Sequence, residues 1–194
     1  MGEKKNKIEV DSEKVWMILP ESGSGDRYYL SEAQGALVEG LRHGTHCQCC
    51  GRWSQIYDHS LNKAMVRSLG WLVRASRESR LGVGNGWVDV PNSAPKWLTR
   101  TNQLPTTANW RLCERMANDD PKKKKSGIWR PTEKGKAFMS GEILITARVA
   151  TLFGNVVAYS REMISINSVL PNFSYAALMN GSVDIKDFLA SLRW

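Results

Sequence analysis

The chain has 194 residues, of which 42% are hydrophobic and 24% charged, and 27 Lys and Arg against 19 Asp and Glu leave a net charge of +8. A chain of this length buries a core without disulfides, and no apolar run approaches the roughly 18 residues that a transmembrane helix needs. The first residues lack the pattern of a signal peptide. We therefore expect a cytoplasmic protein with reduced cysteines and no membrane partner.

The positive charge is concentrated in one segment. Residues 96–136 contain eleven Lys and Arg against four Asp and Glu, a net of +7, whereas residues 137–194 are neutral. A concentration of this kind indicates a surface that binds phosphate groups. The alternative is a solvated surface whose charge keeps the protein soluble.

Residues 1–80 are predicted to form a helical region. Ser31 and Gln34 fit a capping box that opens a helix over residues 31–43. A second helix is expected over residues 58–77, where four apolar side chains recur near one face. Those side chains are Leu61, Met65, Leu69 and Leu72.

A cluster of cysteines and histidines separates these two helices. Cys47 and Cys50, followed by Gly51, have the Cys-x-x-Cys-Gly spacing that lets two thiolates meet one metal. A structural zinc site is therefore predicted, with His46 and His59 as the further candidate ligands. The alternative ligands are His43, Cys49 and the remote Cys113. Reduced cysteines in a buried position and a redox pair are the other interpretations of the spacing.

The basic segment predicts short helices followed by a hairpin. After a turn at residues 82–86 and a strand at 87–90, helices are expected over residues 96–101 and 107–117. At 100° per residue the second helix gathers its apolar residues, Trp110 among them, on one arc and its polar residues on the other. A basic loop over 118–127 then leads to a strand over 128–130. Thr132 is expected to cap a helix over 133–139.

This order of elements, with the sequence Pro-Thr-Glu-Lys-Gly-Lys-Ala-Phe at 131–138, resembles the winged helix-turn-helix domain of MarR-like and PadR-like proteins. The chain also resembles uncharacterised bacteriophage-encoded proteins, through its motifs at 47–51, 129–138 and 173–179. The winged helix implies a recognition helix that precedes a charged β-wing. The phage resemblance places the first wing strand at 112–117, which would end the helix near Arg111.

The predicted fold class is α+β, with a winged helix-turn-helix core over 81–140. The N-terminal helices occupy 1–80, and residues 141–194 are expected to form a β-hairpin and a helix. The hairpin strands are predicted at 143–152 and 156–159. Because this last region is neutral, we expect it to pack on the core or to mediate a homodimer.

The predicted function is binding to double-stranded DNA, as a phage regulatory or replication-associated factor. Side chains of the helix are expected to contact bases or phosphates. Side chains of the wing are expected to contact phosphates. The residues concerned are Thr106, Thr107, Arg111, Arg115, Lys122, Lys123, Lys124, Lys125 and Arg130. The alternative is a phage-encoded inhibitor that binds a host protein, a defence or transcription component, through the same basic surface. An enzyme is not expected, because the sequence has no Walker loop, Gly-x-Ser-x-Gly or His-Glu-x-x-His motif.

Overall fold

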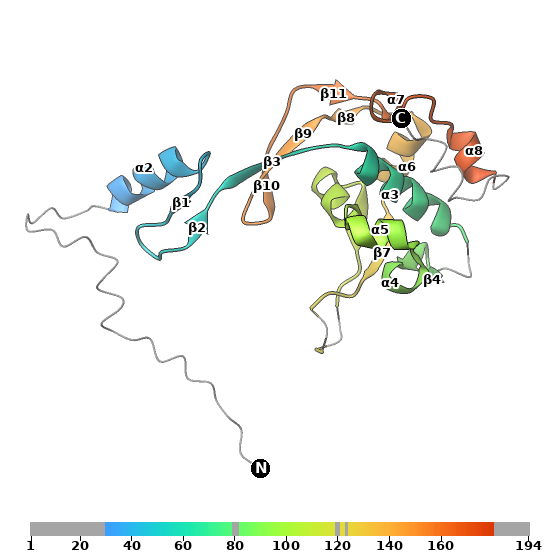
Figure 1. Cartoon of the computed structure of the whole chain (residues 1–194), viewed down its shortest axis with the longest axis horizontal. Coiled ribbons are helices and arrows are strands. Elements are labelled where there is room, and N and C mark those ends of the chain that lie inside the picture. The colour runs from blue at the N-terminus through green and yellow to red at the C-terminus, as the bar shows by residue number, and fades with distance from the viewer. Residues whose placement is uncertain (1–29, 79–81, 119–120, 123, 181–194) are drawn as a thin grey trace, which may run out of the picture. The chain divides into compact units, whose positions relative to one another are not determined.

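The computed structural model describes residues 30–78, 82–118, 121–122 and 124–180. It combines helices with several small antiparallel sheets, which confirms the α+β class (Figure 1). The chain divides into two units, residues 1–56 and 57–194. The helix that follows residue 62 lies in the second of these units and contributes to its core.

The first unit contains a helix and a short hairpin. Helix α2 (Leu30–Gly40) confirms the helix predicted after Ser31, although it ends three residues earlier than expected. Strands β1 (Thr45–His46) and β2 (Trp53–Ser54) pair antiparallel, with His46 opposite Trp53. The Cys-x-x-Cys-Gly motif forms the turn between these two strands.

The second unit is built around helix α3 (Lys63–Ala75), whose middle turns are almost entirely buried. The Asn62 side chain caps the helix by accepting a hydrogen bond from the Met65 N–H at 2.9 Å. The helix predicted from residue 58 is wrong over its first residues, which form strand β3 (Ile56–Ser60) instead. There the side chain of His59 hydrogen-bonds to Thr151, which lies 92 residues further along the chain. A prediction from local spacing cannot take such a distant partner into account.

A four-stranded antiparallel sheet packs against this helix, in the strand order β4-β5-β7-β6. Its four strands and the three helical segments between β5 and β6 are all short. They are β4 (Gly82–Gly84), β5 (Trp87–Asp89), α4 (Val90–Ser93), α5 (Lys96–Thr101), β6 (Cys113–Arg115) and β7 (Ile128–Pro131). The seventh is a 3-10 helix, η1 (Leu104–Trp110), which immediately precedes β6.

The helix predicted over 107–117 is therefore wrong beyond Trp110. Arg111 has a φ of 59°, a left-handed conformation that ends the helical turn, and β6 begins two residues later. Trp110 is fully buried and donates its indole N–H to the Thr146 carbonyl at 2.7 Å, so it is fixed from outside the helix. The strand at 113–115 agrees with the position that the phage resemblance implies for the first wing strand.

The motif at 131–138 has a structural explanation. The Thr132 hydroxyl caps helix α6 (Glu133–Ser140) by accepting the Gly135 N–H at 3.0 Å, as predicted. A Cβ atom at position 135 would overlap the backbone carbonyl of Leu112, so only glycine allows α6 to lie this close to the chain before β6. Phe138 is fully buried. The three residues thus cap, dock and anchor one helix.

The predicted hairpin is confirmed, but its first strand, predicted over 143–152, is interrupted at Ala147. Strands β9 (Arg148–Leu152) and β10 (Asn155–Tyr159) pair antiparallel around Gly154, and β3 joins them in the order β10-β9-β3. Four further short elements lie in this part of the chain, one before β9 and three after β10: β8 (Ile145–Thr146), β11 (Met163–Ile164), α7 (Ile166–Val169) and α8 (Tyr175–Met179). The helix predicted near the C-terminus lies outside the described residues. Within those residues, no helix has the length and apolarity needed to cross a bilayer.

Candidate nucleic-acid interface

Two adjoining cavities lie between the helical connection after β5 and the β6–β7 hairpin. Their volumes are about 580 and 430 Å³, and they share Pro105, Arg115, Lys125 and Trp129. We call the two cavities together the basic groove. Among the described residues that line it, the ionisable side chains are all cationic, namely Arg115, Lys124 and Lys125. The basic groove therefore has the charge that attracts phosphate.

Trp129 forms a rigid wall of this groove. It occupies β7, paired with Val88 on one side and with Arg115 on the other, and it is only 7% exposed. The guanidinium carbon of Arg115 lies 5.6 Å from the centroid of the Trp129 ring, within the range of a cation–π interaction. Arg115 itself is exposed. Its charge is thus held at the groove and stays accessible to a ligand.

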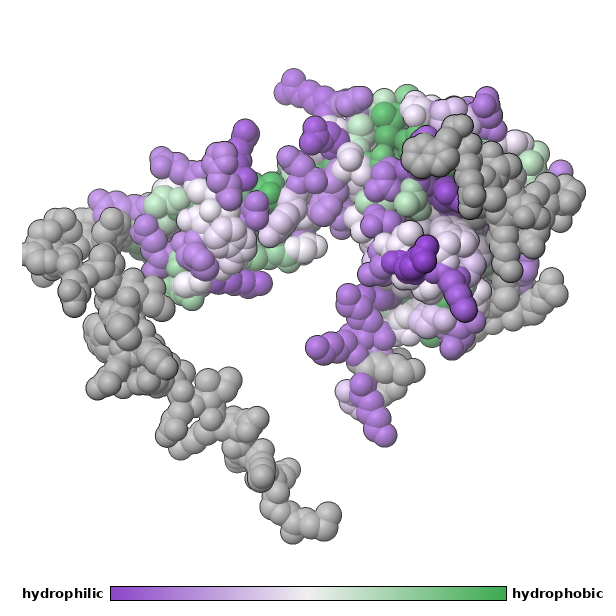
Figure 2. Space-filling view, viewed as in Figure 1, coloured by the Kyte–Doolittle hydropathy of each residue, from purple (hydrophilic) through white to green (hydrophobic). Residues whose placement is uncertain are grey.

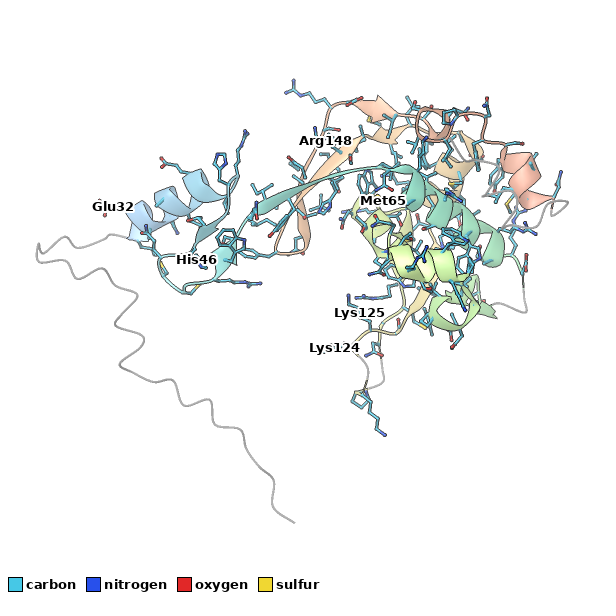
Figure 3. All side chains as sticks on the ribbon, in the orientation of Figure 1. Glu32, His46, Met65, Lys124, Lys125 and Arg148 are labelled. Carbon is cyan, nitrogen blue, oxygen red and sulfur yellow. The ribbon has the colours of Figure 1, made fainter. Side chains whose placement is uncertain are left out.

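The base of the hairpin loop is fixed by hydrogen bonds. The Met116 N–H donates to the Ile128 carbonyl at 2.9 Å, and the Ser126 hydroxyl donates to the Met116 carbonyl at 2.7 Å. Lys124 and Lys125 precede this fixed point, are exposed, and belong to the loop at the end of the hairpin (Figure 3). The described side chains of the loop tip are hydrophilic (Figure 2). Lys122 is also exposed, whereas Lys123 lies outside the described residues.

Arg130 occupies the opposite face of the same hairpin. Its Nε donates to Glu114 Oε1, and its guanidinium lies over the Trp87 ring, 4.3 Å from the centroid. Successive residues of a strand point to opposite faces, so Glu114 and Arg130 face away from their neighbours Arg115 and Trp129. Accordingly they line a different cavity of about 400 Å³. The structure therefore does not bring Arg130 to the basic groove.

Three of the residues that were predicted to contact DNA, Thr106, Thr107 and Arg111, do not line the basic groove either. Thr107 is fully buried, and its hydroxyl donates to the Leu104 carbonyl at 2.7 Å. The side chain of Thr107 is therefore not free to meet a nucleic acid. Thr106 is half-buried, and its N–H already donates to the Gln103 carbonyl at 3.2 Å. Arg111 is exposed, but it does not line either cavity of the basic groove.

A neighbouring hollow of about 500 Å³ adds two cations that the sequence reasoning missed. Lys96 and Arg100 of helix α5 are exposed and line it together with Trp97 and Thr99. Thr99 also lines the larger cavity of the basic groove, so the two features adjoin. Both cations belong to the segment with a net charge of +7, which was the one signal that could have identified them.

The predicted metal ligands are split between the two units. His46, Cys47 and Cys50 lie in and beside the β1–β2 turn of the first unit. His59 belongs to β3, where its Nε2 lies 2.9 Å from the Thr151 hydroxyl oxygen. Among the residues that the structure describes, no three metal-ligating side chains form a group that could hold an ion. The zinc site remains a prediction.

Comparison with known proteins does not assign a family or a function to this chain. No protein-family model, curated protein or solved structure matches it. The resemblances to winged helices and to phage proteins therefore stay predictions.

Proposed function

We propose that this chain is a DNA-binding protein with a winged-helix core, and that the basic groove and the β6–β7 loop bind duplex DNA. The observation that carries the proposal is the groove lining: every ionisable side chain among its described residues is a cation. A duplex presents two rows of phosphates. A groove of this charge beside a lysine-rich loop is complementary to them.

The order and pairing of the elements support the winged-helix part of the proposal. Helix α3 is followed by strands β4 and β5, by helices α4, α5 and η1, and then by the β6–β7 hairpin. In the sheet, β7 lies between β5 and β6, so the strand that precedes these helices pairs with the last strand of the series. In the winged helix, η1 would correspond to the recognition helix and the β6–β7 loop to the wing.

The shape of η1 favours contacts with the DNA backbone over contacts with base edges. The helix has seven residues, and three of them, Leu104, Thr107 and Trp110, are buried. Its partly exposed polar side chains, Thr106 and Asn109, are short. The long exposed side chains that follow it, Arg111 and Arg115, are cations, which can meet phosphates on any sequence. We therefore propose binding with little preference for DNA sequence.

The strength of this binding must depend on salt. Five described cations line the basic groove or the adjoining hollow, and they are Lys96, Arg100, Arg115, Lys124 and Lys125. Each neutralised phosphate contributes about −0.9 to the slope of log affinity against log salt, so five contacts predict a slope of about −4 to −5.

A titration of labelled duplexes tests the proposal. Fluorescence anisotropy of two unrelated duplexes of equal length is followed as the purified chain is added, over a series of salt concentrations. We expect similar affinities for both duplexes and a steep loss of affinity with salt. Absence of binding at about 50 mM salt would overturn the proposal, and would favour the alternative partner, a protein with an acidic surface.

A further inference from the structure

Helix α5 presents one tryptophan and two cations on the same side. The helix ends at Asn102, whose φ is 48° and whose N–H donates to the Leu98 carbonyl at 3.0 Å. With about 100° of rotation per residue, Lys96, Trp97 and Arg100 fall within one arc of about 100°. Leu98 lies outside this arc and is buried in the core. The packing of Leu98 therefore turns the tryptophan and the two cations away from the core together.

Trp97 is the apolar wall of the hollow that adjoins the basic groove. Four described residues line this hollow of about 500 Å³, and Trp97 is the only apolar one among Lys96, Trp97, Thr99 and Arg100. The indole is half-buried, and the guanidinium carbon of Arg67 lies 5.5 Å from its ring centroid, within the range of a cation–π interaction. The ring is thus held in place while it borders open space.

The lining of the basic groove is more apolar than phosphate binding requires. Six of the eleven described residues that line its larger cavity are apolar, and two of them, Pro91 and Pro105, are at least partly exposed. Thr99 lines both this cavity and the hollow beside Trp97. Phosphates gain nothing from apolar walls, and the base faces of a duplex are stacked against one another inside it. An unpaired base, in contrast, has free faces that stack on aromatic side chains.

We propose that the adjoining hollow binds an unpaired base of DNA, stacked on Trp97, with Lys96 and Arg100 on the adjacent phosphates. The chain then prefers a duplex that carries a single-stranded extension, with the paired part along the basic groove. Stacking accepts any base, because every base has a π-face, so the proposed lack of sequence preference is retained. This inference rests on the proposed function and adds to it the class of DNA that is bound.

An abasic extension isolates the contribution of the bases. Three labelled DNAs share one paired sequence: a blunt duplex, a duplex with a short thymine extension, and a duplex with an abasic extension of the same length. The two extensions carry the same phosphates, so only stacking distinguishes them. We expect the thymine extension to bind at least about fivefold more tightly than the abasic one. Because stacking releases no counterions, this ratio should change little over a salt series.

The three DNAs separate a failure of this inference from a failure of the proposed function. Equal affinities for the thymine and abasic extensions, with the blunt duplex still bound, would overturn the inference and leave the proposed function intact. Absence of binding to all three at about 50 mM salt would overturn the proposed function, and this inference with it.

Variants of Trp97 assign the stacking to this ring. The ratio of the affinities for the thymine and abasic extensions is measured within each variant, so a change in overall affinity cancels. Trp97→Leu should reduce the ratio to about one, and Trp97→Phe, which keeps a π-face, should retain most of it. Trp53→Leu is the matched control, because Trp53 is exposed but lines neither the hollow nor the groove. A ratio that persists in Trp97→Leu, or is lost equally in Trp53→Leu, would contradict the assignment.

A second measurement needs no substitution, and therefore covers the case in which a Trp97 variant does not fold. The unsubstituted chain is irradiated with a duplex whose extension contains 5-iodouracil, and the cross-linked peptide is identified by mass spectrometry after proteolysis. We expect the cross-link in the peptide that includes Trp97. Cross-links confined to peptides outside residues 90–130 would overturn the proposed position of the unpaired base.

Discussion

Arg115 lies directly opposite Trp129 in the β6–β7 pairing, with its guanidinium over the indole ring. The preceding pair, Glu114 and Arg130, forms an ion pair on the other face of the hairpin. Two arginines of one hairpin therefore have opposite roles: one is a cation of the basic groove, and the other is neutralised by a carboxylate. This difference gives the proposed function its sharpest test, because each residue is the control for the other.

The lysines of the loop should set the salt dependence of DNA binding. Replacing Lys124 and Lys125 together by Ala removes two cations that line the basic groove, so the salt slope should become shallower by about two. The double replacement by Arg keeps both charges and should leave the slope unchanged. The slopes are measured by anisotropy over a salt series. An unchanged slope in the Ala variant would exclude these lysines from the interface.

Gly135 should be irreplaceable for a steric reason. In Gly135→Ala the added Cβ overlaps the Leu112 carbonyl, and we expect a loss of about 1–3 kcal/mol in the free energy of unfolding. Gly35→Ala is the matched control: this glycine also lies within a helix, α2, but nothing lies within 4 Å of its added Cβ. The control should be neutral or gain up to about 1 kcal/mol. Urea denaturation measures both, and equal effects would contradict the close approach.

Trp110 should connect η1 to the C-terminal strands. Trp110→Phe keeps an aromatic ring but removes the N–H that donates to the Thr146 carbonyl, which leaves a half-buried acceptor unpaired. The expected loss of stability is about 1–3 kcal/mol. Trp53→Phe, at a position 45% exposed, should have little effect on the same unfolding transition. A Trp110 variant as stable as the unsubstituted chain would show that this bond is not important.

Cys113 should make stability fall at alkaline pH. Burial raises the pKa of its thiol to about 11, from an ordinary value of 9.0. The folded state therefore favours the neutral thiol, and this contribution is complete below pH 9 and is lost as the pH rises through 11. Two pKa units correspond to about 2.7 kcal/mol.

The comparison with Cys113→Ala isolates that contribution, because other groups titrate equally in both proteins. The free energy of unfolding of the unsubstituted chain should fall by about 2 kcal/mol more than that of the variant between pH 9 and 11. Parallel pH profiles would show that the thiol ionises without penalty in the folded chain.

Local sequence signals predicted some elements well. Thr132 is a cap whose hydroxyl meets a nearby N–H, and Gly154 lies in a hairpin turn, so each depends on residues a few positions away. The burial of Thr107 and the strand after Trp110 could not be predicted from neighbouring residues alone. The apolar residues Leu112 and Cys113 are compatible with the buried arc of a helix. They are equally compatible with a buried position at the start of a strand, which is where the structure places them.

The residues predicted for the candidate site also depended on whether the segment after Trp110 is a helix or a strand. In a helix, Arg111 and Arg115 share a face, which suggested one contact surface. In the strand, successive side chains point to opposite faces of the sheet. Arg115 therefore faces the basic groove, and Glu114 faces away from it. Lys96 and Arg100 were visible only as part of a charged segment, because their proximity to the groove depends on how α5 packs.

The most direct test of the proposed function compares Arg115→Ala with Arg130→Ala. Both variants remove one positive charge from the same hairpin, and the melting temperature of each verifies that it folds. Binding of one labelled duplex is measured by anisotropy over a salt series. We predict that Arg115→Ala weakens binding by about tenfold at low salt and reduces the salt slope by about one, while Arg130→Ala changes neither. An equal loss in the two variants, or a loss confined to Arg130→Ala, would contradict a DNA-binding surface at the basic groove.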